Sequence, residues 1–375
     1  MTPSTDIFKE GARQFTICNA CRYCEGFCPV WPVMERRTEF GKGDLYYLAN
    51  ICHDCKACYY ACPYTEPNEQ KMNIPKLLSE LRLAAYKEYA IPRPSSAYFD
   101  RHKRYFAATL VASLVAMTLF ALLVGNPQRL LTPHLEPGSF YDIFPYLVIV
   151  VVGMGIGLAV LGNYIYNMLR YFKDIGGKIG KVHVKTIFQA AADVFLHNGF
   201  KGGWHIKSSK AGCYHEKTTS SYSFLSLHAL IFYGFILAII STSTAAIYQQ
   251  VLGVLPPYPI ISVPVLFGIA GGICMLIGTF AFFFYERRED IRPIIKRMAT
   301  LDFAFLTCLI AVNITGFLTL IFRATSLMGV IFTVHMGFVL LLFITAPFGK
   351  FVHFTYRYVA LVMTRIEEMM ESHQA

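Results

Sequence analysis

The chain has 375 residues, of which 55% are hydrophobic and 15% are charged, and its mean hydropathy is +0.43. This composition excludes an ordinary soluble protein of this size and predicts that most of the chain lies in a lipid bilayer. The formal net charge is +10 at pH 7. Because the basic residues are spread over several short connections instead of forming one patch, the sequence does not predict nucleic-acid binding.

Two copies of one cysteine motif stand near the N-terminus. The pattern C-x2-C-x2-C-x3-C-P begins at Cys18 and again at Cys52. This spacing is typical of proteins with two [4Fe-4S] clusters, in which the last cysteine of each run ligates the other cluster. We therefore expect two ligand sets, which are Cys18, Cys21, Cys24 and Cys62 (set A) and Cys52, Cys55, Cys58 and Cys28 (set B).

Two other uses of clustered cysteines fit this pattern less well. A secreted domain stapled by disulfides is expected to follow a cleavable signal peptide, whereas residues 1–17 are polar and mixed. A structural zinc site uses two cysteine pairs separated by a longer loop, not four thiols within eleven residues. The sequence therefore favours iron–sulfur clusters over disulfides or zinc.

The residues around the motifs favour helices. Apolar residues between Pro29 and Ile51, and again from Ile74 to Tyr89, recur mostly at helical intervals. We predict an α-helical ferredoxin domain over residues 1–92, followed by a proline-containing linker at Ile91 to Pro94.

Six apolar stretches follow, each with the roughly 20 residues that a helix needs to cross a bilayer. They run from about Tyr105 to Val124, Pro145 to Met168, Phe224 to Tyr248, Pro259 to Phe284, Leu301 to Phe322 and Leu327 to Pro347. We therefore predict an all-α protein in which the ferredoxin domain (1–92) is fused to a six-helix transmembrane bundle. Its further parts are the first two spans (93–170), a basic loop (171–222), a four-helix transmembrane bundle for haem b (223–365) and a tail (366–375).

Lysine and arginine residues distinguish the two sides of the predicted membrane domain. They are frequent before the first span, between spans two and three, between spans four and five, and after the sixth span, whereas the opposite connections hold only Arg129 and Arg323. Basic connections stay in the cytoplasm. We therefore expect a multi-pass protein of the bacterial inner membrane with the cluster domain and the C-terminus on the cytoplasmic side.

The long basic loop contains an amphipathic segment and several histidines. Its apolar residues Val184, Ile187, Phe188, Ala191, Val194 and Phe195 fall on one helical face, which predicts a helix lying on the membrane surface. The loop also contains His183, His197, His205, His215 and Cys213. No pair of these has a tight ligand spacing, so surface or interfacial positions are preferred over a metal site.

Ionisable residues inside transmembrane spans are costly and are functional candidates. His228 lies in the third span, His335 in the sixth, and His353 on a predicted continuation of the sixth helix. Because 18 residues separate His335 and His353, we expect both on one face of a single helix, about 27 Å apart.

Neutral imidazoles from facing helices are ordinary axial ligands of haem b. We expect His228 and His353 to bind one haem, and the pair of His228 with His335 stays open. A second haem would need His335 and a further partner such as His134, and a purely packing role for these histidines is the remaining alternative.

Glycines cluster in two of the predicted spans. They are Gly153, Gly155, Gly157 and Gly162 in the second span, and Gly268, Gly271, Gly272 and Gly278 in the fourth. Small residues let helices approach closely in membranes, so we expect both groups at helix–helix contacts.

The cysteine motifs and the membrane half together resemble the citrate or tricarballylate utilisation protein B family (CitB/TcuB). The resemblance rests on C-N-A-C-R-Y-C-E-G-F-C-P-V from Cys18, H-A-L-I-F-Y-G-F from His228, and P-F-G-K-F-V-H-F-T-Y-R ending at Arg357. The last helix is also similar to that of the cytochrome b subunit of respiratory nitrate reductase, where two histidines of one helix each serve a haem. The third span departs from that subunit, because it offers one histidine instead of two.

The resemblance implies a relay in the membrane. A soluble partner flavoprotein, an FAD-dependent tricarballylate dehydrogenase, would oxidise the substrate, and its reduced flavin would pass electrons through two [4Fe-4S] clusters and haem b to a membrane quinone. The chain has no G-x-G-x-x-G motif after a strand and no P-loop, so we expect no catalytic residue here and leave open whether the chain counts as an enzyme.

Two other functions were weighed. A redox-sensing organic-anion transporter would need intramembrane arginines or broken helices facing its substrate. A heterodisulfide-reductase-like membrane subunit would act on thiols, but the remaining cysteines, Cys213, Cys274 and Cys308, are scattered, and free buried cysteine is common.

Overall fold

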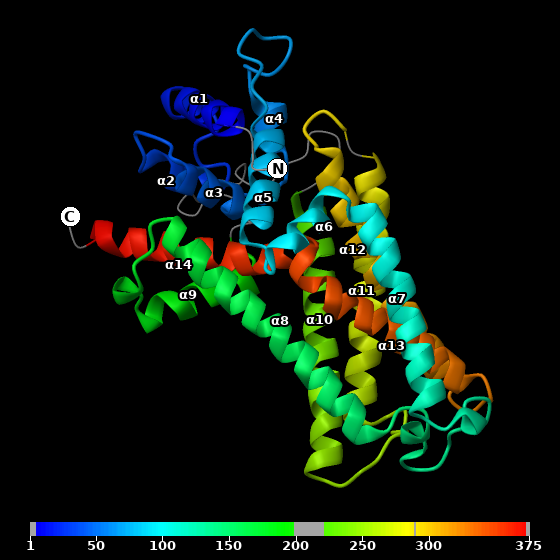
Figure 1. Ribbon diagram of the computed structural model, residues 1–375. Helices are drawn as coiled ribbons and strands as arrows, with labels where there is room; N and C mark the ends of the chain where they lie inside the picture. Colours follow the sequence, from blue (N-terminus) through cyan, green and yellow to red (C-terminus); the bar gives the residue numbers. More distant parts are fainter. Residues whose placement is uncertain (1–4, 199–220, 289, 373–375) are drawn as a thin grey trace.

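The computed structural model describes residues 5–198, 221–288 and 290–372, and within these ranges every regular element is a helix. This confirms the all-α prediction. Five helices form the N-terminal cysteine domain, which are α1 (Thr5–Cys21), α2 (Val30–Glu35), α3 (Lys42–Ile51), α4 (Ala57–Ala61) and α5 (Ile74–Tyr89). The remaining helices are α6 (Ser96–Asp100), α7 (His102–Leu123), α8 (Tyr146–Asp174), α9 (Val184–Phe195), α10 (Ser221–Gln250), α11 (Val263–Arg288), α12 (Lys296–Ile321), α13 (Met328–Thr345) and α14 (His353–Ser372) (Figure 1).

Six of these helices are long and apolar enough to cross a membrane. They are α7, α8, α10, α11, α12 and α13, and they coincide with the six predicted spans. Figure 1 shows them extending away from the cysteine domain, and the connections that follow α7, α10 and α12 gather at the opposite end, here called the far end. The chain therefore fits a multi-pass membrane protein with its cysteine domain at one end of the bundle.

The far-end connections hold one another by backbone hydrogen bonds. The amide of Gly138 donates to the carbonyl of Pro256 over 2.6 Å. His134 is fully buried in the same region, and its two ring nitrogens each lie 2.9 Å from a backbone carbonyl, those of Ser139 and Arg129. His134 thus braces the connection between α7 and α8, and this geometry gives no support to a haem that uses it.

The sixth span and the C-terminal helix are two separate helices, so the expectation of one continuous helix is wrong. After α13 ends at Thr345, the chain makes two short 3-10 turns, η6 (Ala346–Phe348) and η7 (Lys350–Val352), before α14 begins at His353. Pro347 lacks a backbone N–H and Gly349 adopts an extended backbone, which interrupts the helical hydrogen bonds. His335 and His353 therefore do not share a helical face, and the 27 Å spacing does not apply.

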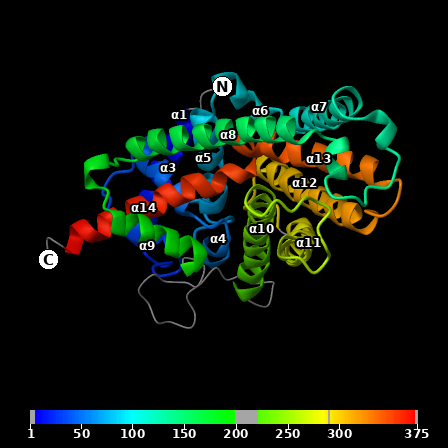
Figure 2. The same cartoon turned by 90° about the horizontal axis from the view of Figure 1, so that it is seen from below.

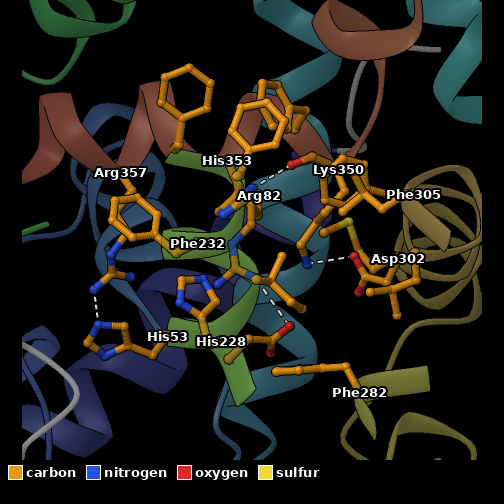
Figure 3. Close-up of a pocket in the computed structure, with 18 of the residues that line it drawn as sticks. His53, Arg82, His228, Phe232, Phe282, Asp302, Phe305, Lys350, His353 and Arg357 are labelled. Carbon is orange, nitrogen blue, oxygen red and sulfur yellow. Dashed lines mark hydrogen bonds and ion pairs between the residues drawn. The ribbon is translucent and has the colours of Figure 1, made fainter. Parts of the chain in front are cut away.

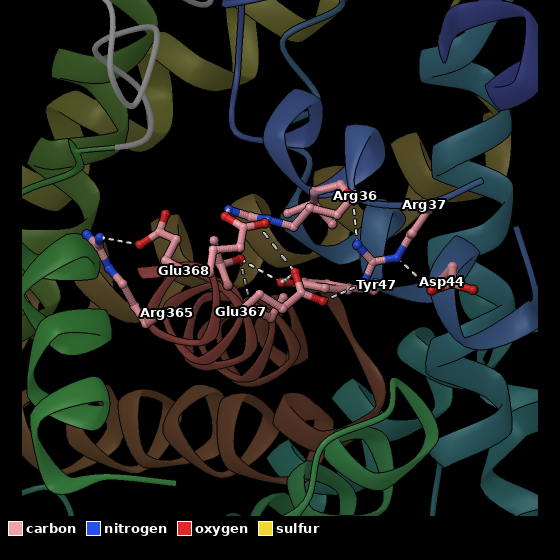
Figure 4. Close-up of polar contacts among 11 residues, drawn as sticks. Arg36, Arg37, Asp44, Tyr47, Arg365, Glu367 and Glu368 are labelled. Atoms are coloured by element: carbon pink, nitrogen blue, oxygen red, sulfur yellow. Dashed lines mark hydrogen bonds and ion pairs between the residues drawn. The ribbon is translucent and has the colours of Figure 1, made fainter. Parts of the chain in front are cut away.

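Helix α14 runs along the cysteine domain well past the predicted boundary at residue 365. The guanidinium of Arg37 in the cysteine domain lies 2.6 Å from Asp44 and 2.7 Å from Glu367 of α14. The hydroxyl of Tyr47 lies 2.8 Å from that of Thr364 (Figure 4). Residues 366–372 are thus the last turns of a helix that contacts the cysteine domain, not a separate tail.

The predicted amphipathic segment is helix α9, which lies beside α14 (Figure 2). Its inner face is partly polar, and the buried Asp193 forms an ion pair of 2.6 Å with Arg365 of α14. Its apolar residues Val184 and Phe188 are exposed by 69% and 70%. An apolar face turned outward is what a helix lying on a lipid surface requires.

The two glycine groups differ in their surroundings. A Cβ added at Gly271 of α11 would lie 2.7 Å from the backbone oxygen of Gly234 in α10, so the two helices approach at backbone distance there. By contrast, a Cβ added at Gly153 or Gly157 of α8 would meet nothing within 4 Å. The expectation of helix contacts is right for the fourth span and wrong for the second within the described structure, because α8 turns its glycines outward.

We predict that Gly271→Ala destabilises the protein by about 1–3 kcal/mol, because its methyl group would force α10 and α11 apart. Gly153→Ala is the matched control and is expected to have no effect or to stabilise slightly, since alanine favours the helix. Thermal unfolding of both variants in the same detergent measures the difference. Equal losses in the two variants would contradict the assigned contact.

Candidate cofactor site

Most of the neighbouring thiols of Cys18 and of Cys58 belong to the predicted set of that cysteine. Burial and the nearby thiols of the other set A members, Cys62 first, raise the pKa of Cys18 to about 12. Burial and the thiols of Cys52, Cys55 and Cys28, with a smaller contribution from Cys24 of set A, raise the pKa of Cys58 well above its usual value. A cluster would bind these groups as thiolates, and its iron would supply the positive charge that offsets their mutual repulsion.

The loops around the cysteines repeat one backbone geometry. The residue after the second cysteine of each motif, Arg22 or Lys56, has a left-handed backbone with φ of 55° or 62°. The amide of Asp54 donates to the sulfur of Cys52 over 3.3 Å, and that of Tyr64 donates to the sulfur of Cys62 over 3.4 Å. Amides directed at sulfur are suited to an iron–sulfur cluster.

Among the described residues, no group of three or more His, Cys, Asp or Glu side chains is arranged to hold a single metal ion.

A cavity of about 680 Å³ lies where the cysteine domain meets the membrane bundle. Cys52 and His53 of the second motif, His228 of α10 and His353 of α14 all line it (Figure 3). Most of its wall is apolar, with Phe232, Phe235, Phe282, Phe305, Phe351 and Phe354 among the lining residues. Its volume is within the roughly 300–1,000 Å³ of typical cofactor sites.

The imidazole of His353 is oriented by the turn that precedes α14. Its Nδ1 lies 2.7 Å from the carbonyl oxygen of Lys350. A carbonyl can only accept, so Nδ1 carries the proton and Nε2 carries the lone pair. Burial and the nearby Lys350 ammonium lower the pKa of His353 to about 3. The ring is therefore neutral, which is the form that binds a metal.

His228 is oriented by a second histidine in the same way. Nδ1 of His197 lies 3.2 Å from the carbonyl oxygen of Phe195, and its Nε2 lies 3.2 Å from Nδ1 of His228. In the neutral ring His197 donates through Nδ1 and accepts through Nε2, so His228 donates from Nδ1 and keeps the lone pair on Nε2. Both His228 and His353 thus have the tautomer of a ligand that binds iron through Nε2.

Cationic side chains gather at the cysteine-domain end of this cavity. Arg82 of α5 is buried and lies 3.2 Å from Asp54, while Lys350 lies 2.6 Å from Asp302 of α12. Carboxylates near Lys350, that of Asp302 first, outweigh burial and raise its pKa. Arg357 of α14 contacts His53. This region can receive a ligand that carries carboxylates, such as the propionates of haem.

His335 lies apart from this cavity. It does not line the cavity. Its Nδ1 is 3.1 Å from the hydroxyl of Thr315 in α12, and a Cβ added at Gly316 would lie 3.2 Å from its ring. The structure therefore brings together His228 and His353 but not His335.

Sequence analysis missed several residues of the site. A surface or interfacial position was expected for His197, and the structure buries it against His228, whereas His183 is exposed, as expected. His205, His215 and Cys213 lie outside the described residues. The position of Arg357 near the site could have been predicted from the sequence, because Arg357 follows His353 by four residues and so shares its helical face.

We predict that the purified protein contains about eight irons with acid-labile sulfide, and that Cys58→Ser or Cys21→Ser each removes about four. Cys274→Ser in α11 is the matched control and should keep the full content, because it belongs to neither motif. Iron, zinc and sulfide analysis after anaerobic purification measures this. Zinc in place of iron, or equal losses in the control, would contradict the assigned sets.

Comparisons with known proteins agree with these features. Residues 11–88 match the family model "Citrate utilization protein B Fer4-like domain", and residues 101–374 match the model "Citrate utilization protein B". The citrate utilization protein B of Escherichia coli is 35% identical over 364 residues, which cover 97% of this chain and 93% of that protein. No solved structure matches the chain. The chain therefore belongs to the citrate utilization protein B family.

Proposed function

We propose that this protein is a membrane electron carrier in citrate or tricarballylate utilisation. It takes electrons from the reduced flavin of a soluble dehydrogenase, an FAD-dependent tricarballylate dehydrogenase type, and delivers them to a membrane quinone. Two [4Fe-4S] clusters and one haem b serve as its carriers. The oxidation of the organic acid itself belongs to the partner.

One observation carries this proposal. The cavity that contains His228 and His353 is also lined by Cys52, a predicted cluster ligand. Arg357 stands on the same face of α14 as His353 and donates to the carbonyl of Ile51 over 3.2 Å. A cluster loop and two imidazoles in a shared wall are what short-range electron transfer between a cluster and a haem requires.

The residues of the cavity fit haem b. His228 and His353 come from different helices and carry their lone pairs on Nε2, while phenylalanines supply an apolar wall. The hydroxyl of Tyr86 is buried in the same wall and has no hydrogen-bond partner among the described residues, so a polar group of a ligand would stabilise it. When bound, haem and the clusters would supply one-electron redox centres; the protein positions them and excludes water.

The exposure of the cysteines supports an order in which electrons would pass from one cluster to the other. Cys21 of set A is exposed, and Tyr23 beside it is exposed by 63%, whereas all four cysteines of set B are half-buried. We infer that a flavoprotein docks near set A and that set B passes electrons onward to the cavity. One reduced flavin gives up two electrons singly and releases two protons.

The distribution of basic residues supports a cytoplasmic position for the cysteine domain in the bacterial inner membrane. The helix ends beside this domain are rich in lysine and arginine, and the far-end connections are poor in them. This orientation leaves the exposed set A accessible to a soluble partner in the cytoplasm.

We expect reduced-minus-oxidised spectra to show a b-type α-band that His228→Ala and His353→Ala each abolish, because each removes one axial ligand. His183→Ala changes an exposed histidine outside the cavity and should leave the band intact. His335→Ala should also keep the full band if one haem is present; loss of half of it would indicate a second haem. A band that survives both cavity variants would overturn the assignment.

A further inference from the structure

The cavity has a lateral opening among the membrane helices. Leu161 of α8, Ile239 of α10 and Phe343 of α13 all line the cavity, and their side chains are exposed by 53%, 48% and 45%. All three lie within the predicted spans, in helices that are long and apolar enough to cross a membrane. In a bilayer these side chains face acyl chains, so an apolar molecule can reach the cavity from the lipid without passing through water.

One polar group stands beside this opening. Tyr164 lies three residues after Leu161, so both share a face of α8. Tyr164 lines the cavity and is 8% exposed, and its hydroxyl has no hydrogen-bond partner among the described residues. A buried hydroxyl without a partner is costly, and a ligand with an acceptor oxygen removes that cost.

Aromatic rings connect Tyr164 with the interior of the cavity. Its ring contacts Phe354 with centroids 5.4 Å apart, Phe354 contacts Phe351 at 5.2 Å, and Phe351 contacts Phe235 at 5.3 Å. A flat ring fits such a wall by edge and face contacts. An acyl chain would fill the same space but offers no acceptor to Tyr164.

We propose that this opening is the quinone site, and that the Tyr164 hydroxyl donates a hydrogen bond to a carbonyl oxygen of the quinone ring. The inference rests on the proposed function, and it assigns a binding site to the electron acceptor of that function, the quinone. The quinone gains two electrons, which the partner's reduced flavin supplies one at a time, and two protons from the cytoplasmic water, and leaves as quinol through the same opening. The cationic end of the cavity stays available for haem carboxylates.

The test uses the full-length protein in lipid nanodiscs, reduced with a stoichiometric amount of dithionite and mixed with decylubiquinone, while the haem α-band is followed. Tyr164→Phe should raise the quinone concentration for half-maximal reoxidation about five- to tenfold, because one hydrogen bond is lost. Leu161→Trp should slow reoxidation at all quinone concentrations, because the indole obstructs the opening.

Two variants on the same helix serve as controls. Tyr166 and Leu158 are exposed by 52% and 63% and do not line the cavity, so Tyr166→Phe and Leu158→Trp should behave like the wild type. Ferricyanide, a soluble oxidant, should reoxidise all variants equally, which reports intact clusters and haem.

The outcomes separate the two proposals. A wild-type protein that lacks the haem band, or that decylubiquinone does not reoxidise, overturns the proposed function and this site with it. A wild type that reacts with quinone while Tyr164→Phe and Leu161→Trp match their controls overturns only the site, since the quinone then binds elsewhere.

Discussion

The structure depends on one backbone carbonyl that two arginines share. The carbonyl oxygen of Cys52 accepts hydrogen bonds from Arg82 of α5 at 3.1 Å and from Arg357 of α14 at 3.4 Å. The second cysteine loop is therefore tied to the helix that begins with His353. Other polar contacts, such as Arg37 with Glu367 and Tyr47 with Thr364, also join the cysteine domain to α14, but this connection is the one that ties the cluster loop to the helix turn that carries His353.

Burying these charges has a cost that limits what the cavity can bind. Arg82 and Lys350 each have one carboxylate partner, Asp54 and Asp302, and breaking such a buried pair typically costs about 3–5 kcal/mol. Arg357 contacts backbone carbonyls and His53. This end of the cavity therefore presents cationic groups beside an apolar wall, although the lining as a whole holds four basic residues (Lys56, Arg82, Lys350 and Arg357) and four acidic ones (Asp54, Asp193, Glu286 and Asp302). A ligand that is apolar at one edge and anionic at the other matches this distribution, and a porphyrin with two carboxylates is such a ligand.

The sequence predicted the structural features that depend on residues close together in the chain. Cysteine spacing predicted two thiol neighbourhoods, and apolar periodicity predicted six spans and the bounds of α5. Contacts between distant segments were not predictable: His197 reaches His228 only because α9 packs on α14. The break before His353 was visible as Pro347 and Gly349, but the apolar run across them suggested a continuous helix. Glycine spacing alone did not distinguish α11, which packs on α10, from α8, whose glycines face outward.

The position of the cavity decides how the proposed electron carrier would act. His335 is bonded to Thr315 outside the cavity, so the proposed path runs from the exposed Cys21 to the opening beside Tyr164 and stays at the cysteine-domain end of the bundle. Moving one electron across the whole membrane would gain or cost about 2.3 kcal/mol for each 100 mV of membrane potential. A path that begins and ends near one membrane surface avoids most of this electrical energy. In the proposed arrangement the protein therefore passes electrons into the quinone pool without itself generating a membrane potential, and the far half of the bundle serves to anchor and support the cavity.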